Sequence, residues 1–162
     1  MKNCYKNNAK NNIIINNIDK KTYRATCSLS CCNDDSFEIY FYGELIKSIF
    51  NKYHLFPKDS DERLIVFAKC HNCQSEINIF NNLEDGYDNY YEPHKNKSKK
   101  LNFKKFDCPK CSNNNFKVKI ILEYSEEDYS KIIDEKFSWI WVSLKCSECG
   151  KEYKNIIDVE TS

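Results

Sequence analysis

The chain of 162 residues contains few of the residues that interrupt regular structure, with three glycines and three prolines. This scarcity excludes a flexible linker protein. Its formal net charge is +1, so no global attraction to nucleic acid or membrane surfaces is indicated. No run approaches the roughly 18 apolar residues of a membrane helix, and the polar stretch after Met1 lacks the apolar segment of a secretory signal. These absences predict a cytoplasmic protein without membrane contact.

Cysteine, by contrast, is abundant, with ten residues in the chain. In a reducing compartment, paired cysteines are better explained as metal ligands than as disulfides. Cys4 stands alone in a polar stretch and is expected to bind nothing. The cysteines lie at positions 4, 27, 31, 32, 70, 73, 108, 111, 146 and 149.

Two Cys-x-x-Cys pairs in the second half of the chain bracket strand-like sequence. One is Cys108-Pro109-Lys110-Cys111 and the other is Cys146-Ser147-Glu148-Cys149. Each pair can form a tight turn that presents two sulfurs, and a hairpin between the turns would bring four sulfurs into a tetrahedron. Four thiolates in that arrangement are typical of structural zinc. The sequence therefore predicts a zinc site at Cys108, Cys111, Cys146 and Cys149.

A second site is expected in the first half, where Cys70 and Cys73 follow the apolar run RLIVFAK. Cys27 is expected to join them, and the fourth ligand is either Cys32 or Cys31. The register of an internal repeat favours Cys32, whereas the shorter loop from Cys27 favours Cys31. We predict Cys27, Cys32, Cys70 and Cys73, which makes two structural zinc ions per chain. Two alternatives stay open: His71 as a substitute ligand, and a cross-pairing of 70/73 with 108/111.

The two halves of the sequence match each other in order. A cysteine, a polar turn and an alternating strand occur as Cys32, NDDS and FEIYFY, and again as Cys111, SNNN and FKVKII. Later, RLIVFAKCHNC matches WIWVSLKCSEC. Between these strands the apolar positions 45, 46, 49, 50 and 53 follow a helical face, and Ser125–Asp128 resembles a capping box before a short helix through Ile132 and Ile133.

These knuckles, Cys-Pro-Lys-Cys and Cys-Ser-Glu-Cys-Gly, resemble those of zinc-ribbon proteins, over about 27–157. The resemblance implies a β-rich α+β fold of two tandem zinc-ribbon-like antiparallel β units, each with a short helical insertion. The expected organisation is an Asn-rich disordered tail (1–19), the first unit (20–82), an acidic and then Lys-rich linker (83–105), and the second unit (106–162).

An enzyme is not expected from this sequence. Four thiolates close the zinc shell and leave no position for a reactive water. The three histidines, at 54, 71 and 94, provide no His-x-Glu ahead of Pro-Cys-x-x-Cys, as a zinc deaminase requires. We find no Ser/His/Asp arrangement and no phosphate-binding glycine loop.

The expected function is a zinc-stabilised module for protein–protein interaction, of the kind found in small bacterial or phage accessory or immunity proteins. The alternative is a nucleic-acid-binding zinc-ribbon protein. Trp139 and Trp141 share a strand face, where they either pack in the core or offer a platform for bases. The linker lysines are either solvated or contact phosphates. The candidate partner or nucleic-acid contacts are Lys97, Lys99, Lys100, Lys104, Trp139 and Trp141.

Overall fold

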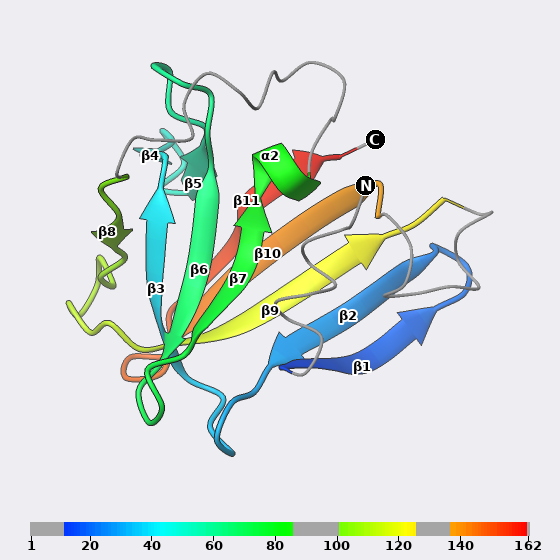
Figure 1. The fold of residues 1–162 in the computed structure, drawn as a ribbon, viewed down its shortest axis with the longest axis horizontal. Helices are drawn as coiled ribbons and strands as arrows, with labels where there is room; N and C mark the ends of the chain where they lie inside the picture. The colour runs from blue at the N-terminus through cyan, green and yellow to red at the C-terminus, as the bar shows by residue number, and fades with distance from the viewer. Residues whose placement is uncertain (1–11, 86–100, 126–136, 162) are drawn as a thin grey trace.

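The computed structural model describes residues 12–85, 101–125 and 137–161. These residues form almost entirely β-structure (Figure 1). Nine strands belong to one curled sheet, and two more form a separate hairpin. The strands of the sheet are β1 (Ile13–Asp19), β2 (Arg24–Leu29), β3 (Phe37–Tyr42), β6 (Ile65–Cys70), β7 (Glu76–Asn81), β8 (Lys104–Lys105), β9 (Phe116–Glu123), β10 (Trp139–Cys146) and β11 (Glu152–Glu160).

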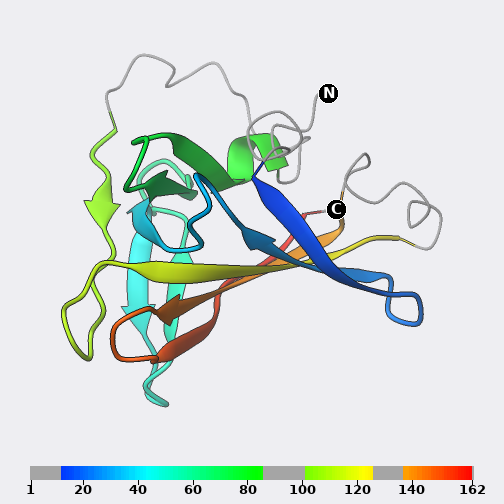
Figure 2. The ribbon, with the colours of Figure 1, turned by 90° about the horizontal axis from the view of Figure 1, so that it is seen from below.

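Strand β9 runs through the middle of the sheet (Figure 2). It pairs with β10 along one edge, and with β2 and then the start of β3 along the other, all antiparallel. Beyond them, β11 pairs with β10, β1 with β2, and β6 and β7 follow β3. In Figure 1, β3 and β6 cross the direction of β9 and β10 steeply, so the sheet curls around its inner face.

Alternating burial along the strands explains why these segments pair as they do. In β9, every second residue from Phe116 to Leu122 is buried and the residues between them face outward. The same period of two occurs in β2, β3 and β6, as expected for a sheet with one covered face. The inward side chains of both halves form one hydrophobic cluster. The two units expected from the sequence therefore share a sheet and a core.

The α+β prediction with helical insertions is wrong for the described residues. The segment expected as a helix is a hairpin of β4 (Glu44–Lys47) and β5 (Tyr53–Phe56). A left-handed residue, Asn51 (φ 57), turns the chain between the two strands. The only helix of the described residues is the single turn α2 (Asn82–Asp85). The second expected helix, through Ile132 and Ile133, lies outside the described residues.

The expected tail and linker also contribute strands to the sheet. Within 1–19, residues 13–19 form β1, an edge strand on β2. At the end of 83–105, β8 pairs with β3 through Lys105↔Tyr40 and Lys104↔Phe41.

Candidate metal centres

The second tetrad consists of Cys108, Cys111, Cys146 and Cys149, as the sequence predicted. Cys108 and Cys111 lie in the turn before β9, Cys146 ends β10, and Cys149 lies in the turn before β11. The four sulfurs lie within 4.8 Å of one another. Cys108 Sγ is 3.7 Å from Cys149 Sγ, and Cys111 Sγ is 3.5 Å from Cys146 Sγ.

The spacing of these sulfurs fits a tetrahedral metal ion. A Zn–S bond of about 2.3 Å implies sulfur–sulfur separations of about 3.8 Å. The nine described cysteines are free thiols, and the measured separations are far longer than the roughly 2.05 Å of a disulfide. The donor set is thus chemically and geometrically suited to one metal ion.

Backbone hydrogen bonds shape both turns of this tetrad. The N–H of Ser112 donates to Cys108 O (2.8 Å), and the N–H of Gly150 donates to Cys146 O (3.0 Å). Ser112 (φ 65) and Gly150 (φ 72) have left-handed backbone conformations, so in both turns the backbone reverses direction just after the second cysteine. That reversal points both sulfurs of a pair toward the same space.

The first tetrad consists of Cys31, Cys32, Cys70 and Cys73, whose sulfurs also lie within 4.8 Å of one another. Cys31 Sγ is 3.5 Å from Cys73 Sγ and 3.9 Å from Cys32 Sγ. The knuckle at Cys70 repeats the pattern of Cys146, because Gln74 N–H donates to Cys70 O (3.0 Å). The two tetrads could therefore hold two metal ions, and the pairing of 70/73 with 108/111 does not occur.

Cys27 does not belong to the first tetrad, contrary to the sequence-based prediction. It lies in the middle of β2, fully buried, with Ala25 and Leu29 on the same face. Cys31 takes the place expected for Cys27. Cys31 and Cys32 are therefore both members of the first tetrad, and neither excludes the other. The alternation of Ala25, Cys27 and Leu29 was the sequence signal that Cys27 faces the core.

The strand registers around the two tetrads correspond. Phe37 pairs with Cys70, Phe116 pairs with Cys146, and the two phenylalanines pair with each other. A single row, Cys70–Phe37–Phe116–Cys146, therefore joins the tetrads across the sheet. Three steps of about 5 Å place the α-carbons of Cys70 and Cys146 about 15 Å apart.

The correspondence extends to the strands that lead into each tetrad. Cys27, four residues before Cys31, pairs with Ile120. Lys104, four residues before Cys108, pairs with Phe41. Ile120 and Phe41 each lie four residues after the phenylalanine of the central pair. Cys27 thus occupies the position that Lys104, which is not a ligand, has in the other half.

Hydroxyl and backbone donors favour the thiolate at one cysteine of each tetrad. Burial opposes ionisation of Cys108, but the hydroxyl of Tyr153, 3.1 Å from its sulfur, and the backbone N–H groups of Cys111 and Lys110 outweigh it and lower the Cys108 pKa to about 6. The hydroxyl of Ser75, 3.0 Å from Cys73 Sγ, and its backbone lower the pKa of Cys73 to about 6.

Other thiols of the tetrads hold their protons more tightly. Burial and the neighbouring thiol of Cys73 raise the pKa of Cys31 to about 12. At Cys111 the backbone of Asn113 lowers the pKa, but burial and the contact with Cys146 raise it to about 12. Each tetrad therefore has one sulfur ready to bind a cation, and metal binding would release the remaining protons.

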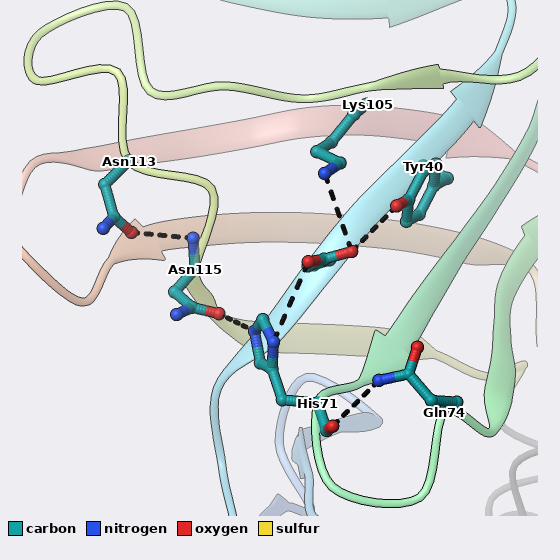
Figure 3. Close-up of polar contacts among 7 residues, drawn as sticks. Tyr40, His71, Gln74, Lys105, Asn113 and Asn115 are labelled. Carbon is teal, nitrogen blue, oxygen red and sulfur yellow. Dashed lines mark hydrogen bonds and ion pairs between the residues drawn. The ribbon is translucent and has the colours of Figure 1, made fainter.

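His71 lies inside the first knuckle but is not among the sulfurs' partners. Figure 3 shows its ring directed at Asn115, which precedes β9, and its Nε2 is hydrogen-bonded to Asn115 Oδ1. Its Nδ1 lies 3.8 Å from Glu38 Oε1. Glu38 also accepts a hydrogen bond from Tyr40 (2.8 Å) and lies 3.8 Å from Lys105 Nζ. His71 thus connects the first knuckle to the segment that leaves the second tetrad.

The remaining predicted contacts lie apart from the tetrads. Lys104 is exposed on β8, whereas Lys97, Lys99 and Lys100 lie outside the described residues. Trp139 and Trp141 are half-buried on the outer face of β10, not in the core. Their rings stack at 5.6 Å and 16°, and the Arg24 guanidinium lies 4.5 Å from the centre of the Trp141 ring.

Comparisons with known proteins add no relative: no protein-family model, no curated protein and no solved structure matches this chain. Among the described residues, no helix is long and apolar enough to cross a membrane.

Proposed function

We propose that both tetrads bind zinc as structural ions and that the chain is a zinc-stabilised protein-interaction module without catalytic activity. The four-sulfur composition of each tetrad supports this proposal, since a closed thiolate shell leaves no ligand position for water or substrate. Reduced thiols in both sets agree with a cytoplasmic setting.

The exposed apolar tip of the β4–β5 hairpin supports a role in protein interaction. Ile49 is 91% exposed and Phe50 is 78% exposed, the highest values among the large exposed hydrophobic side chains of the described residues. Two neighbouring apolar side chains that protrude on a turn are costly in water and are suited to fill a pocket on a partner. The hairpin itself is held in place, because Tyr53 of β5 packs edge-on against Tyr153 of β11 at 5.7 Å.

Charge around the tip indicates the chemistry of the partner surface. Lys47 and Lys52 flank Ile49 and Phe50 on the two sides of the turn. We infer a protein partner with an apolar pocket whose rim carries carboxylates. Such a rim would steer association, and the apolar pocket would supply most of the affinity.

Site-specific photo-crosslinking tests this docking site. A benzoyl-phenylalanine at position 50 of the zinc-loaded protein should crosslink one discrete protein in nuclease-treated host extract. The same probe at Ile14, 48% exposed on β1, is the matched control. The purified partner should then bind the unmodified chain, with binding lost in the Ile49→Ser/Phe50→Ser variant and kept in Ile14→Ser/Ile18→Ser. Equal crosslinking from both positions, or partner binding that survives Ile49→Ser/Phe50→Ser, would refute the assignment.

We also propose that the matching registers of the two halves reflect duplication of one knuckle-bearing β unit. The resemblance to zinc ribbons then applies to the knuckles alone, since the strands of the two units are joined in one sheet. In this arrangement each zinc fixes the ends of strands on which the interaction surface rests, and the zinc content and the partner affinity should fall together when metal is removed.

A further inference from the structure

The outer face of β9 and β10 carries three exposed lysines, Lys117, Lys119 and Lys145, which we call the lysine cluster. Lys117 and Lys145 lie directly opposite each other on the paired strands, and Lys119 lies opposite Ser143. A hollow of about 160 Å³ lies between these side chains, with Glu152 at its edge. Glu152 also lines a pocket with Phe50 and Lys52 of the hairpin, and Lys145 directly precedes the ligand Cys146, so the cluster adjoins the hairpin tip and the second tetrad. None of its three lysines belongs to either.

The Lys117–Lys145 pair is unfavourable for the folded chain on its own. Like charges directly opposite on antiparallel strands are destabilising. At the corresponding position of the other half, one residue after Phe37 and one before Cys70, the pair is Glu38↔Lys69, with opposite charges. The first half therefore has an attractive pair of opposite charges at this position, whereas the second half has two lysines that repel each other.

Nearby carboxylates do not cancel the cluster. Asp35 Oδ2 lies 3.5 Å from Lys117 Nζ, but both side chains are more than half exposed, at 63% and 55%. Exposed pairs of this kind contribute little. Glu152 faces Lys145 across the β10–β11 pairing. At the lysine end of this face, three cations against two carboxylates leave a net positive charge. At the tryptophan end, Asp158 and Glu123 lie beside Arg24.

The two tryptophans lie farther along the same strand and on the same face. Trp139, Trp141 and Lys145 lie on the outer face of β10. Ser143, between them, is buried and accepts a hydrogen bond from Asn155 N–H. The six residue steps from Lys145 to Trp139 span about 20 Å. Asp158 accepts a hydrogen bond from Trp139 Nε1 (2.7 Å) and so fixes the ring orientation. Cations at one end and ordered aromatic rings at the other are the two components of a single-strand site.

We propose that this face binds a single-stranded nucleic acid, with its phosphates on the lysine cluster and its bases against Trp139 and Trp141. The ligand's phosphates would add negative charge beside a lysine pair that Asp35 and Glu152 offset only in part. This site goes beyond the protein-docking function proposed above and does not depend on it, because its lysines and tryptophans are not part of the hairpin tip.

Binding of labelled oligonucleotides to the full zinc-loaded chain tests this proposal. The probes are fluorescein-labelled 12-mers of mixed-sequence single-stranded DNA and RNA. Anisotropy should report binding to at least one of them, with a salt dependence of about −2 in log K against log [salt] for three phosphate contacts. The chain has two tryptophans, both on this face. Unlabelled oligonucleotide should therefore quench intrinsic tryptophan fluorescence, whereas inorganic polyphosphate should displace the oligonucleotide without this quenching.

Variants separate this site from general electrostatics. Lys117→Gln/Lys119→Gln should lower the affinity about equally for all sequences and reduce the salt slope from about −2 to about −0.7. Lys47→Gln/Lys52→Gln, which removes the same charge from the hairpin, should leave both unchanged. Lys117→Glu should abolish binding while the free protein becomes no less stable in urea, since it recreates an opposite-charge pair.

Three outcomes would overturn the proposal: no binding of either oligonucleotide at 50 mM salt, binding that is insensitive to Lys117→Gln/Lys119→Gln, or binding without tryptophan quenching. The last outcome would assign the cluster to phosphate polyanions in general.

Discussion

Two hydroxyl groups outside the tetrads influence single sulfurs inside them. Tyr153, 6% exposed, lies beside Cys108, and Ser75 lies beside Cys73. Burial and the contact with Cys108 raise the pKa of Tyr153, and the effect of the contact is the reciprocal of the lowered pKa at Cys108. A phenol that hydrogen-bonds to a thiolate stabilises the ligand before and after metal binding.

Removal of the Tyr153 hydroxyl should therefore weaken the second site selectively. In Tyr153→Phe, the zinc affinity of that site should fall about 10- to 100-fold, the range for outer-shell partners of metal ligands. Competition with a chromophoric chelator measures it. Tyr40→Phe is the matched control, since Tyr40 donates to Glu38 and touches neither tetrad. An unchanged zinc affinity in Tyr153→Phe would show that the hydroxyl does not stabilise the second site.

Cys27, buried in β2, is not needed for zinc binding by the tetrads that the structure describes. Burial raises the pKa of Cys27 to about 11, and no sulfur of the first tetrad depends on it. Cys27→Ala should retain two zinc ions per chain and lose about 1 kcal/mol of stability through the small cavity. Cys31→Ala should bind one ion. Elemental analysis distinguishes them, and a single zinc in Cys27→Ala would restore Cys27 as a ligand.

Among the ligands, the sequence allowed prediction of those that stand in Cys-x-x-Cys turns next to a predicted strand. Cys70, Cys73 and the four cysteines of the second tetrad follow that rule. The adjacent pair Cys31-Cys32 does not, because two residues that separate the cysteines of the other front turn are missing here. Spacing from Cys27 then suggested a Cys-x-x-x-Cys turn, although strand alternation places Cys27 in the core.

At the scale of elements, the β4–β5 hairpin shows where periodicity misleads. Leu45, Ile46, Ile49, Phe50 and Tyr53 fit a helical face, but short apolar runs fit either structure. A helix there would need a buried stripe, whereas the hairpin buries Leu55 and leaves Ile49 and Phe50 in solvent. Tertiary contact of Tyr53 with Tyr153, remote in sequence, favours the strand conformation. Local sequence carries no record of that contact.

Gly43, between β3 and β4, lies where the β4–β5 hairpin leaves the sheet and has no room for a side chain. It has φ +158, and a Cβ there would lie 2.6 Å from Phe56 O and 2.8 Å from Leu64 Cδ1. Gly43→Ala should therefore destabilise the zinc-loaded protein by about 1–3 kcal/mol, the range for overpacking, as measured by urea unfolding.

Gly150→Ala is the matched control for that measurement. Gly150 is left-handed at φ +72, but nothing lies within 4 Å of a Cβ there. It should lose about 1 kcal/mol through backbone strain alone. Equal losses in the two variants would show that backbone strain, and not the contact with β5, accounts for Gly43.

At the scale of the whole molecule, the two metal centres belong to one mechanical unit. Predicting the paired knuckles and the strands between them required only local patterns. The joining of the halves did not follow from them, because β2 pairs with β9 and β8 with β3 across the middle of the chain. Strands that are distant in sequence find each other through the shared core, which no local pattern encodes.

This arrangement predicts that damage at one centre spreads to the other. Cys146→Ser removes a ligand of the second tetrad, and Cys146 pairs with Phe116, which pairs with Phe37 of the strand that holds Cys70. Since metal binding and folding are linked, amide exchange should accelerate in β2 and β3 as well as in β9, β10 and β11. The zinc affinity of the first tetrad should also decrease.

Hydrogen-exchange mass spectrometry and chelator titration of the same sample measure both effects, with Lys151→Gln in the same turn as the control. Lys151 is exposed and contributes no sulfur, so its variant should exchange like the unmodified protein. If the halves were independent, faster exchange in Cys146→Ser would stay within 108–157 and the first site would keep its zinc affinity. The row from Cys70 to Cys146 predicts the opposite, because a sheet that loses its central strand β9 also loses the partner of β2 and the anchor of β3.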